Sequence, residues 1–162
     1  MKYYIVGYMY SGKSTVGRRL AAERGLAFVD LDKLFEERYH YTVARFFDVF
    51  GEAAFRRLEG QLLRSTADLD DVVVATGGGT PCFGDNMDFI LAHGTAVYLR
   101  LSVDALVERA LHSRNPRPAM RGLSPDAIRD KVERQMKERE GFYLRAQVIV
   151  DGELPECVKG IE

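Results

Sequence analysis

Residues 7–14 read GYMYSGKS and match the phosphate-binding pattern G-x-x-x-x-G-K-[ST] in full. The apolar run Tyr3–Val6 precedes this pattern, and a helix-like stretch, Lys13–Arg24, continues from it. The motif requires a strand, a glycine-rich loop and a helix in this order, because backbone N–H groups and the helix dipole bind phosphate together. We therefore expect a nucleotide site in which Lys13 reaches the β- and γ-phosphates and Ser14 binds Mg²⁺.

Short apolar runs and helical patterns alternate along the chain. The apolar runs predict strands at Tyr3–Val6, Ala27–Val29, Val72–Ala75, Ala96–Leu99 and Val148–Val150. The helical patterns cover Lys13–Arg24, Lys33–Arg38, Val43–Phe50, Glu52–Ala67, Asn86–Ala92, Val103–Leu111 and Pro125–Tyr143. The strand runs are continuous, as in strands that are covered on both faces. An α/β fold with a parallel sheet follows, and its ligands should bind at the carboxyl ends of the strands.

Composition narrows the class of protein. The 162 residues suit one domain with a full core, and 23 Lys+Arg against 24 Asp+Glu argue against a nucleic-acid or membrane-surface protein. The two cysteines, Cys82 and Cys157, are too few for a disulfide framework and fit a reducing cytosol. No run approaches the roughly 20 apolar residues of a membrane helix, and no signal segment precedes the first strand. We expect a cytoplasmic protein without membrane or nucleic-acid partners.

Two carboxylates stand at the end of the second predicted strand, in the sequence Asp30-Leu31-Asp32. Strand alternation should place both on the same side, near the phosphate loop. One can hold the water shell of Mg²⁺, and the other can orient or deprotonate an acceptor hydroxyl. The alternative is that Asp32 caps the helix that follows.

Three other segments carry candidate binding residues. Three glycines, residues 77–79, follow the third strand and suit either a close backbone approach to a ligand or a flexible turn. Arg56 and Glu59 share one helix face, where Arg56 can grip a carboxylate or the pair can form a solvated surface. Arg139, near the end of a basic helix, is either an anion clamp or a helix C-terminal cation.

The segment Ser113–Gly122 contains three arginines, Arg114, Arg117 and Arg121. Its two prolines and its glycine argue against a regular helix. The segment is either a mobile cap over phosphates or an arginine-rich surface loop.

In combination, these motifs resemble the shikimate kinase family of aromatic amino-acid biosynthesis. They run, in order, G-x-x-x-x-G-K-[ST], D-x-D, G-E-x-x-F-R-x-x-E, G-G-G, Arg-Pro and R-x-x-x-Y, and span Gly7–Tyr143. The resemblance implies a three-layer αβα P-loop kinase fold with a five-stranded parallel sheet in the order 2-3-1-4-5. It implies a single domain over residues 1–162, with a helical substrate-binding region at about 32–61 and a lid at about 112–122.

The resemblance also implies a reaction, in which ATP and Mg²⁺ serve to phosphorylate the 3-hydroxyl of shikimate, and a monomeric enzyme. The catalytic residues it implies are Lys13, Asp32 and Arg117. Shikimate would be bound by Asp32, Phe47, Phe55, Arg56, Gly77, Gly78, Gly79 and Arg139. ATP would be bound by Gly7, Tyr10, Ser11, Gly12, Lys13, Ser14, Thr15, Arg117 and Pro155, and the metal by Ser14 and, through water, Asp30. The chain departs from the family pattern at Ala119-Met120 and at Gly141.

Two other functions compete with this one. A related small kinase, such as gluconate kinase, would share Lys13 and the lid but need not keep Arg56, Glu59 and the three glycines together. A non-catalytic nucleotide-binding module would need no acceptor clamp, so Asp32 and the two clamp arginines argue against it.

Overall fold

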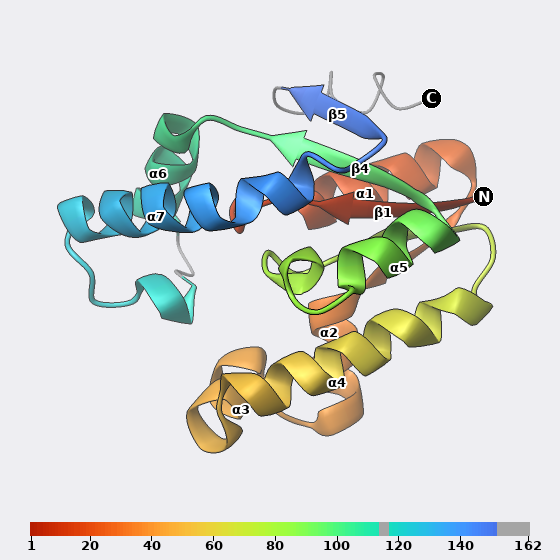
Figure 1. Cartoon of the computed structure of the whole chain (residues 1–162), viewed down its shortest axis with the longest axis horizontal. Coiled ribbons are helices and arrows are strands. Elements are labelled where there is room, and N and C mark those ends of the chain that lie inside the picture. The colour runs from red at the N-terminus through yellow and green to blue at the C-terminus, as the bar shows by residue number, and fades with distance from the viewer. Residues whose placement is uncertain (114–116, 152–162) are drawn as a thin grey trace.

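The apolar runs form a single parallel sheet. A computed structural model describes residues 1–113 and 117–151 of the chain. Its strands are β1 (Lys2–Val6), β2 (Ala27–Asp30), β3 (Val72–Ala75), β4 (Thr95–Arg100) and β5 (Val148–Asp151). They pair in the order β2-β3-β1-β4-β5, and every pairing is parallel. Figure 1 shows β1, β4 and β5 pointing the same way. The predicted sheet order is confirmed.

The helices lie close to their predicted positions. They are α1 (Lys13–Arg24), α2 (Leu31–Tyr39), α3 (Val43–Phe50), α4 (Glu52–Ser65), α5 (Asn86–His93), α6 (Val103–Leu111) and α7 (Pro125–Tyr143). Short 3-10 turns cover Thr66–Asp68 (η1), Thr80–Cys82 (η2) and Pro118–Met120 (η3). The fourth predicted helix was two residues too long, because the chain tightens into η1 after Ser65. No helix in residues 1–113 or 117–151 has the length and apolar character needed to cross a bilayer.

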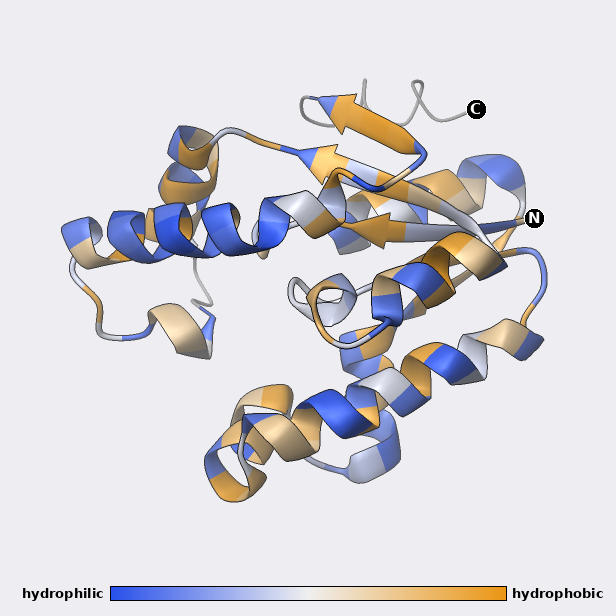
Figure 2. Cartoon of the chain, in the orientation of Figure 1, coloured by the Kyte–Doolittle hydropathy of each residue, from blue (hydrophilic) through white to orange (hydrophobic). Residues whose placement is uncertain are grey.

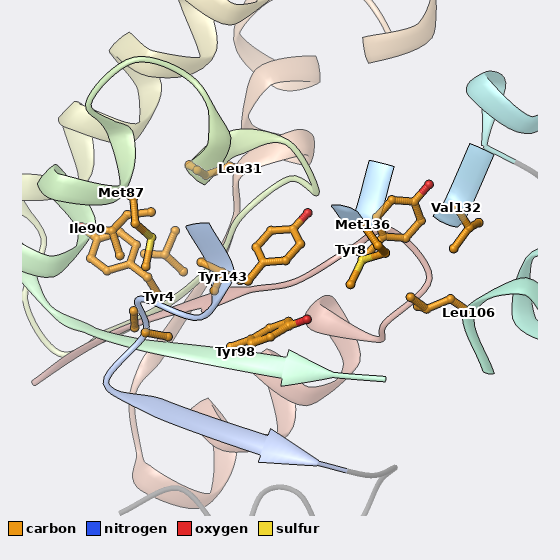
Figure 3. Packing of buried hydrophobic residues seen from close by; sticks show 14 of the residues in the cluster. Tyr4, Tyr8, Leu31, Met87, Ile90, Tyr98, Leu106, Val132, Met136 and Tyr143 are labelled. Carbon is orange, nitrogen blue, oxygen red and sulfur yellow. The ribbon is translucent and has the colours of Figure 1, made fainter. Parts of the chain in front are cut away.

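Helices cover both faces of the sheet. Successive side chains of a strand point to opposite faces, so Tyr3 and Ile5 of β1 pack with α1 residues such as Leu20. Tyr4 and Val6 point the other way, into a larger cluster built with α5, α6 and α7. Figure 3 shows this cluster above β4, and Figure 2 shows hydrophobic residues along the strands and hydrophilic ones along much of α7. Burial on both faces explains why the strand sequences are continuously apolar.

Helices α2, α3 and α4 form a third apolar cluster of their own. Its centre is Phe35, whose ring centroid lies 5.1 Å from that of Phe46 and 5.0 Å from that of Phe55. Both contacts have the edge-to-face geometry that aromatic rings prefer. This packing fixes α4 relative to α2, and thereby relative to β2, from which α2 directly continues.

The register of the three strands β2, β3 and β1 brings their carboxyl ends together. Asp30 pairs with Ala75, and Ala75 pairs with Ile5. The ladder extends past the strand end, where the Thr76 amide donates to the Ile5 carbonyl at 3.1 Å. The phosphate loop, the two aspartates and the three glycines therefore begin at the same edge of the sheet.

Candidate active site

A cleft of about 1020 Å³ opens at this edge of the sheet. Most of the predicted site residues line it: Tyr10, Gly12, Lys13, Ser14, Thr15, Asp30, Asp32, Phe47, Phe55, Arg56, Gly77, Gly78, Gly79, Arg117 and Arg139. Gly7 and Ser11 are buried behind the cleft wall, in the phosphate loop itself. Pro155 lies outside the described residues. Side chains from five separate parts of the sequence thus meet around one space.

The phosphate loop has the backbone that its glycines permit. Gly12 caps α1 with φ +90°, and it has no side chain with which to bond the first-turn amides that a phosphate would use. Gly7 has no room for a side chain, because a Cβ would lie 3.0 Å from the Leu99 carbonyl oxygen. Both glycines therefore allow a loop conformation that a residue with a side chain would disfavour.

Lys13 is held inside the loop, where its Nζ donates to the Tyr8 carbonyl at 2.9 Å. Burial lowers the pKa of Lys13 to about 8, although the carboxylates of Asp32 and Asp30 oppose this shift. Arg117 adds to the lowering by repulsion. A buried ammonium with a depressed pKa is short of negative charge, which a bound phosphate would supply.

Asp30 joins the phosphate loop to α2. The Ser14 hydroxyl donates to Asp30 Oδ2 at 2.7 Å, and Asp30 Oδ1 accepts from the amides of Asp32 and Lys33 at 3.1 and 3.3 Å. Asp30 is therefore the N-cap of α2. Both carboxylates line the cleft beside the phosphate loop, as expected, but strand alternation is not what places them there. The alternative of a cap at Asp32 was wrong, because Asp30 is the cap. The cap starts the helix at Leu31, so Asp32 reaches the cleft from the first helical turn.

Asp32 faces the glycine segment and the phosphate loop. A Cβ on Gly77 would lie 3.1 Å from Asp32 Oδ1. Burial raises the pKa of Asp32, and the neighbouring Asp30 carboxylate raises it further, against the attraction of Lys13 and Arg117. A carboxylate with a raised pKa accepts a proton more readily than an exposed one, which suits a general base.

Arg56 and Glu59 form a largely buried pair at the other end of the cleft. Glu59 is 5% exposed, and its Oε1 accepts from Arg56 Nη1 at 2.9 Å. Its Oε2 accepts from the Thr80 hydroxyl at 2.9 Å, and the Arg56 guanidinium lies 4.1 Å from the centroid of the Phe83 ring. The interpretation of Arg56 and Glu59 as a solvated surface pair was wrong, because η2 and the residues after it cover them.

The three glycines pack against the charged residues of the cleft. A Cβ on Gly79 would lie 2.6 Å from Arg56 Nη2, and one on Gly78 would lie 3.1 Å from a backbone nitrogen of the phosphate loop. No positive φ occurs at Gly77, Gly78 or Gly79. The segment is therefore a tightly packed wall, and the alternative of a flexible turn does not describe it.

Arg139 enters the cleft from α7, near a tyrosine that anchors that helix. The fully buried Tyr143 donates its hydroxyl to the Gly78 carbonyl at 2.5 Å. Burial raises the pKa of Tyr143 above its ordinary value, and the nearby charge of Arg139 offsets only part of this rise. A Cβ on Gly78 would lie 3.8 Å from Arg139 Nη1. Arg139 and Arg56 thus approach neighbouring glycines of the same wall, so both cations face one region.

Arg117 begins a short segment that lines the cleft together with Ala119 and Arg121. Its backbone N–H donates to the Tyr10 hydroxyl at 2.8 Å, and its carbonyl accepts from the Met120 amide at 2.8 Å. Met120 is 2% exposed and belongs to the main hydrophobic cluster. A 3-10 turn in place of a longer helix agrees with the two prolines and the glycine of this region.

Other residues that line the cleft were not predicted from the sequence, among them Lys131 and Gln135. Together with Arg139 they stand four residues apart on α7, so all three lie on one helix face. Lys131 Nζ donates to the Ala119 carbonyl at 2.8 Å, and Gln135 Oε1 accepts from the Tyr8 hydroxyl at 2.5 Å. Their spacing was the signal that could have identified them.

The cleft offers oxygen ligands of the kind that suit Mg²⁺. No cluster of three or more His, Cys, Asp or Glu residues arranged as a metal cage occurs in the part of the chain that the structure describes. Mg²⁺ needs no such cage, since it keeps several waters and binds one or two protein oxygens together with substrate phosphates. The Ser14 hydroxyl and the Asp30 carboxylate, 2.7 Å apart beside the phosphate loop, fit that requirement.

Comparison with known proteins points to one family. The family model for shikimate kinase matches residues 9–156. A shikimate kinase of Parabacteroides distasonis is 43% identical over 150 residues, covering 93% of this chain and 87% of the relative. One from Chromobacterium violaceum is 41% identical over 150 residues, covering 92% of this chain and 79% of the relative.

Solved structures agree. The shikimate kinase of Bacteroides thetaiotaomicron superposes with a TM-score of 0.92 at 36% identity, covering 98% of this chain and 92% of that one. The enzyme of Acinetobacter baumannii, in complex with shikimate, gives a TM-score of 0.87 at 30% identity, covering 98% and 87%. A gluconokinase of Sinorhizobium meliloti, covering 98% and 87%, shares the fold at a TM-score of 0.59 and 19% identity. The chain belongs to the shikimate kinase family, whose members are ATP-dependent kinases.

Proposed function

We propose that this enzyme transfers the γ-phosphoryl group of ATP to the 3-hydroxyl of shikimate, with Mg²⁺ bound, and releases shikimate 3-phosphate and ADP. The observation that carries the proposal is the layout of this cleft. It has a phosphate-binding loop at one end, paired arginines for an anionic acceptor at the other, and Asp32 facing both. A kinase of a carboxylated polyol needs these three parts.

At the nucleotide end, backbone amides of the loop and of the first turn of α1 bind the phosphates. Lys13 neutralises charge on the β- and γ-phosphates, and binding returns its depressed pKa toward the ordinary value. Arg117 adds a second positive charge near the transferring group, where phosphoryl transfer benefits most from fixed cations. Ser14 and Asp30 hold Mg²⁺, Asp30 through water. When bound, the ion would supply positive charge that offsets the negative charge of the phosphates.

At the acceptor end, Arg56 and Arg139 bind the carboxylate of shikimate. Glu59 holds the Arg56 fork through Nη1, and Arg56 lines the cleft, where its guanidinium can donate to a carboxylate. Phe47 and Phe55 form an apolar wall beside this fork, with ring centroids 5.9 and 5.2 Å from the Arg56 guanidinium carbon. The acceptor is thereby held by the end that is remote from the reaction, which leaves its hydroxyl to be aimed.

Asp32 orients the 3-hydroxyl and accepts its proton. The hydroxyl oxygen forms a bond to the γ-phosphorus as the bond between that phosphorus and the β–γ bridging oxygen breaks. The proton passes to the Asp32 carboxylate, and the leaving ADP takes the bond's electron pair. The raised pKa of Asp32 makes it a better acceptor for that proton.

The organisation we propose has one domain over residues 1–162. Residues 32–61 form the acceptor-binding region, and residues 112–122 form a lid that excludes water during transfer. We also propose that the enzyme is a monomer in the cytoplasm, acts in aromatic amino-acid biosynthesis and has no membrane or nucleic-acid partner.

The test is turnover with ATP and Mg²⁺ against shikimate, gluconate and no acceptor. We expect rapid ADP release with shikimate alone, and loss of that release in Lys13→Ala. Preference for gluconate would favour the related small kinase, whose representative shares this fold. Tight ATP binding without turnover on any acceptor would favour a nucleotide-binding module.

A further inference from the structure

The phosphate loop contains a strained tyrosine. Three non-glycine residues have a positive φ within residues 1–113 and 117–151: Tyr10 at 71°, His40 at 60° and Asp71 at 51°. His40 caps the end of α2, a place where left-handed residues are common. Tyr10 instead stands inside the nucleotide site, and a bulky aromatic residue adopts this backbone at an energetic cost. Strain of this kind persists where the surrounding structure compensates for it, and it clusters at functional sites.

The contacts of Tyr10 show which interactions compensate for its backbone strain. Its hydroxyl accepts from the Arg117 backbone N–H at 2.8 Å, although the two residues are 107 positions apart. Its own carbonyl accepts from Arg109 Nη1, on α6, at 3.0 Å. The ring is half-buried and packs against the main hydrophobic cluster. One residue therefore connects the phosphate loop both to α6 and to the segment of the cleft wall that begins at Arg117.

The position of Arg117 depends on few other contacts in the described chain. Its side chain is exposed, and its backbone is held by the Tyr10 hydroxyl on one side and by the Met120 amide on the other. Arg117 nevertheless lines the same cleft as Lys13 and Asp32, and its positive charge contributes to the lowered pKa of Lys13. Fixing the backbone of Arg117 therefore keeps its charge within reach of the cleft.

We propose that Tyr10 is a positioning residue, whose phenol hydroxyl holds the Arg117 backbone so that the guanidinium meets the phosphoryl group in the transition state. The left-handed backbone turns the ring toward Arg117, and this is why the loop keeps a tyrosine in a conformation that glycine adopts freely. The inference rests on the proposed function, because it concerns the residue that stabilises the transferring group.

The first test is Tyr10→Phe, which keeps the ring and removes the hydroxyl. We expect kcat to fall roughly 2- to 12-fold, the range that one net hydrogen bond supports, while the KM for shikimate stays within about twofold. Amide exchange measured by NMR should become faster at Arg117. Tyr98→Phe is the matched control, because its hydroxyl is buried without a hydrogen-bond partner among the described residues. It should keep the wild-type kcat and Arg117 exchange rate.

The second test is a double-mutant cycle with Arg117→Ala. If Tyr10 acts through Arg117, then Tyr10→Phe should change kcat by less than about 1.5-fold in the Arg117→Ala background. An equal loss in both backgrounds, an unchanged kcat in the single variant, or unchanged Arg117 exchange would each overturn the proposal. Inactivity of the wild-type enzyme toward shikimate would instead refute the proposed function. Wild-type activity with an unaltered Tyr10→Phe variant would refute only the role of Tyr10.

Discussion

Replacement of Gly79 by alanine should weaken acceptor binding without disturbing the fold. The new Cβ would lie 2.6 and 2.8 Å from the two Nη atoms of Arg56, against the 3.4 Å at which ordinary contact begins. The guanidinium must therefore move by about 0.8 Å, the difference between 2.6 and 3.4 Å. The backbone of Gly79 has φ −92° and ψ −8°, the geometry of position i+2 in a type I turn, which is compatible with most residues, so the strain falls on the Arg56 side chain.

The size of the effect follows from what Arg56 loses. Hydrogen bonds to charged groups contribute about 1.5–3 kcal/mol, and each 1.4 kcal/mol is a factor of ten in affinity. A guanidinium displaced from its place against Glu59 and Phe83 should lose about one such bond to the shikimate carboxylate. The KM for shikimate should then rise roughly 10- to 150-fold, whereas the KM for ATP should change by less than about twofold.

The assay is steady-state kinetics with each substrate varied in turn, together with thermal unfolding. Arg56→Lys tests the mechanism, because Gly79→Ala should add little once the fork is gone. A KM for shikimate within twofold of wild type would refute the role of the Arg56 fork. An equal rise in both KM values, or a large fall in the unfolding temperature, would show that the substitution acts through the fold.

Three further predictions concern single residues. Gly141→Ala should stabilise the protein by about 1 kcal/mol and raise Tm by roughly 2–4 °C, because a Cβ there meets nothing within 4 Å inside α7; unchanged or lower Tm would contradict this. Lys13→Met should raise the free energy of unfolding of the ligand-free protein most below pH 8, because burial lowers the pKa of Lys13 to about 8, from 10.5 in the unfolded chain, and the charged lysine is then buried at a cost. Denaturant unfolding should show that this gain in stability declines between pH 8 and pH 10.5. Asp32→Asn should lower kcat by roughly 10²-fold or more, and near-normal turnover would remove it from the general-base role.

The fold could be predicted from the sequence because several independent signals agree. Continuous apolar strands, the phosphate loop and the helices between strands indicate a parallel α/β sheet. The strand order came from the family resemblance, since hydrophobic pattern alone does not distinguish one parallel order from another. The shared edge of β1, β2 and β3 then follows, and so does the place of the cleft.

What the sequence could not predict depends on contacts between distant residues. Arg56 and Glu59 have the spacing of a surface pair, and they are covered by Thr80 and Phe83 from another segment. Asp32 falls in a helix because the Asp30 carboxylate satisfies two amides, a local choice that the apolar pattern does not report.

Tyr10 is the clearest case of this limit. Tyrosine carries no turn signal, so its left-handed backbone becomes visible only beside its contact with Arg117.

The most direct test of the account is NMR identification of the product formed from shikimate, ATP and Mg²⁺. We expect one ADP for each shikimate consumed and a single phosphorylated product, with the phosphorus coupled to the proton at carbon 3. Phosphorus on another hydroxyl, or ADP released while shikimate stays intact, would contradict the arrangement in which Arg56 and Arg139 hold the carboxylate and Asp32 aims the 3-hydroxyl.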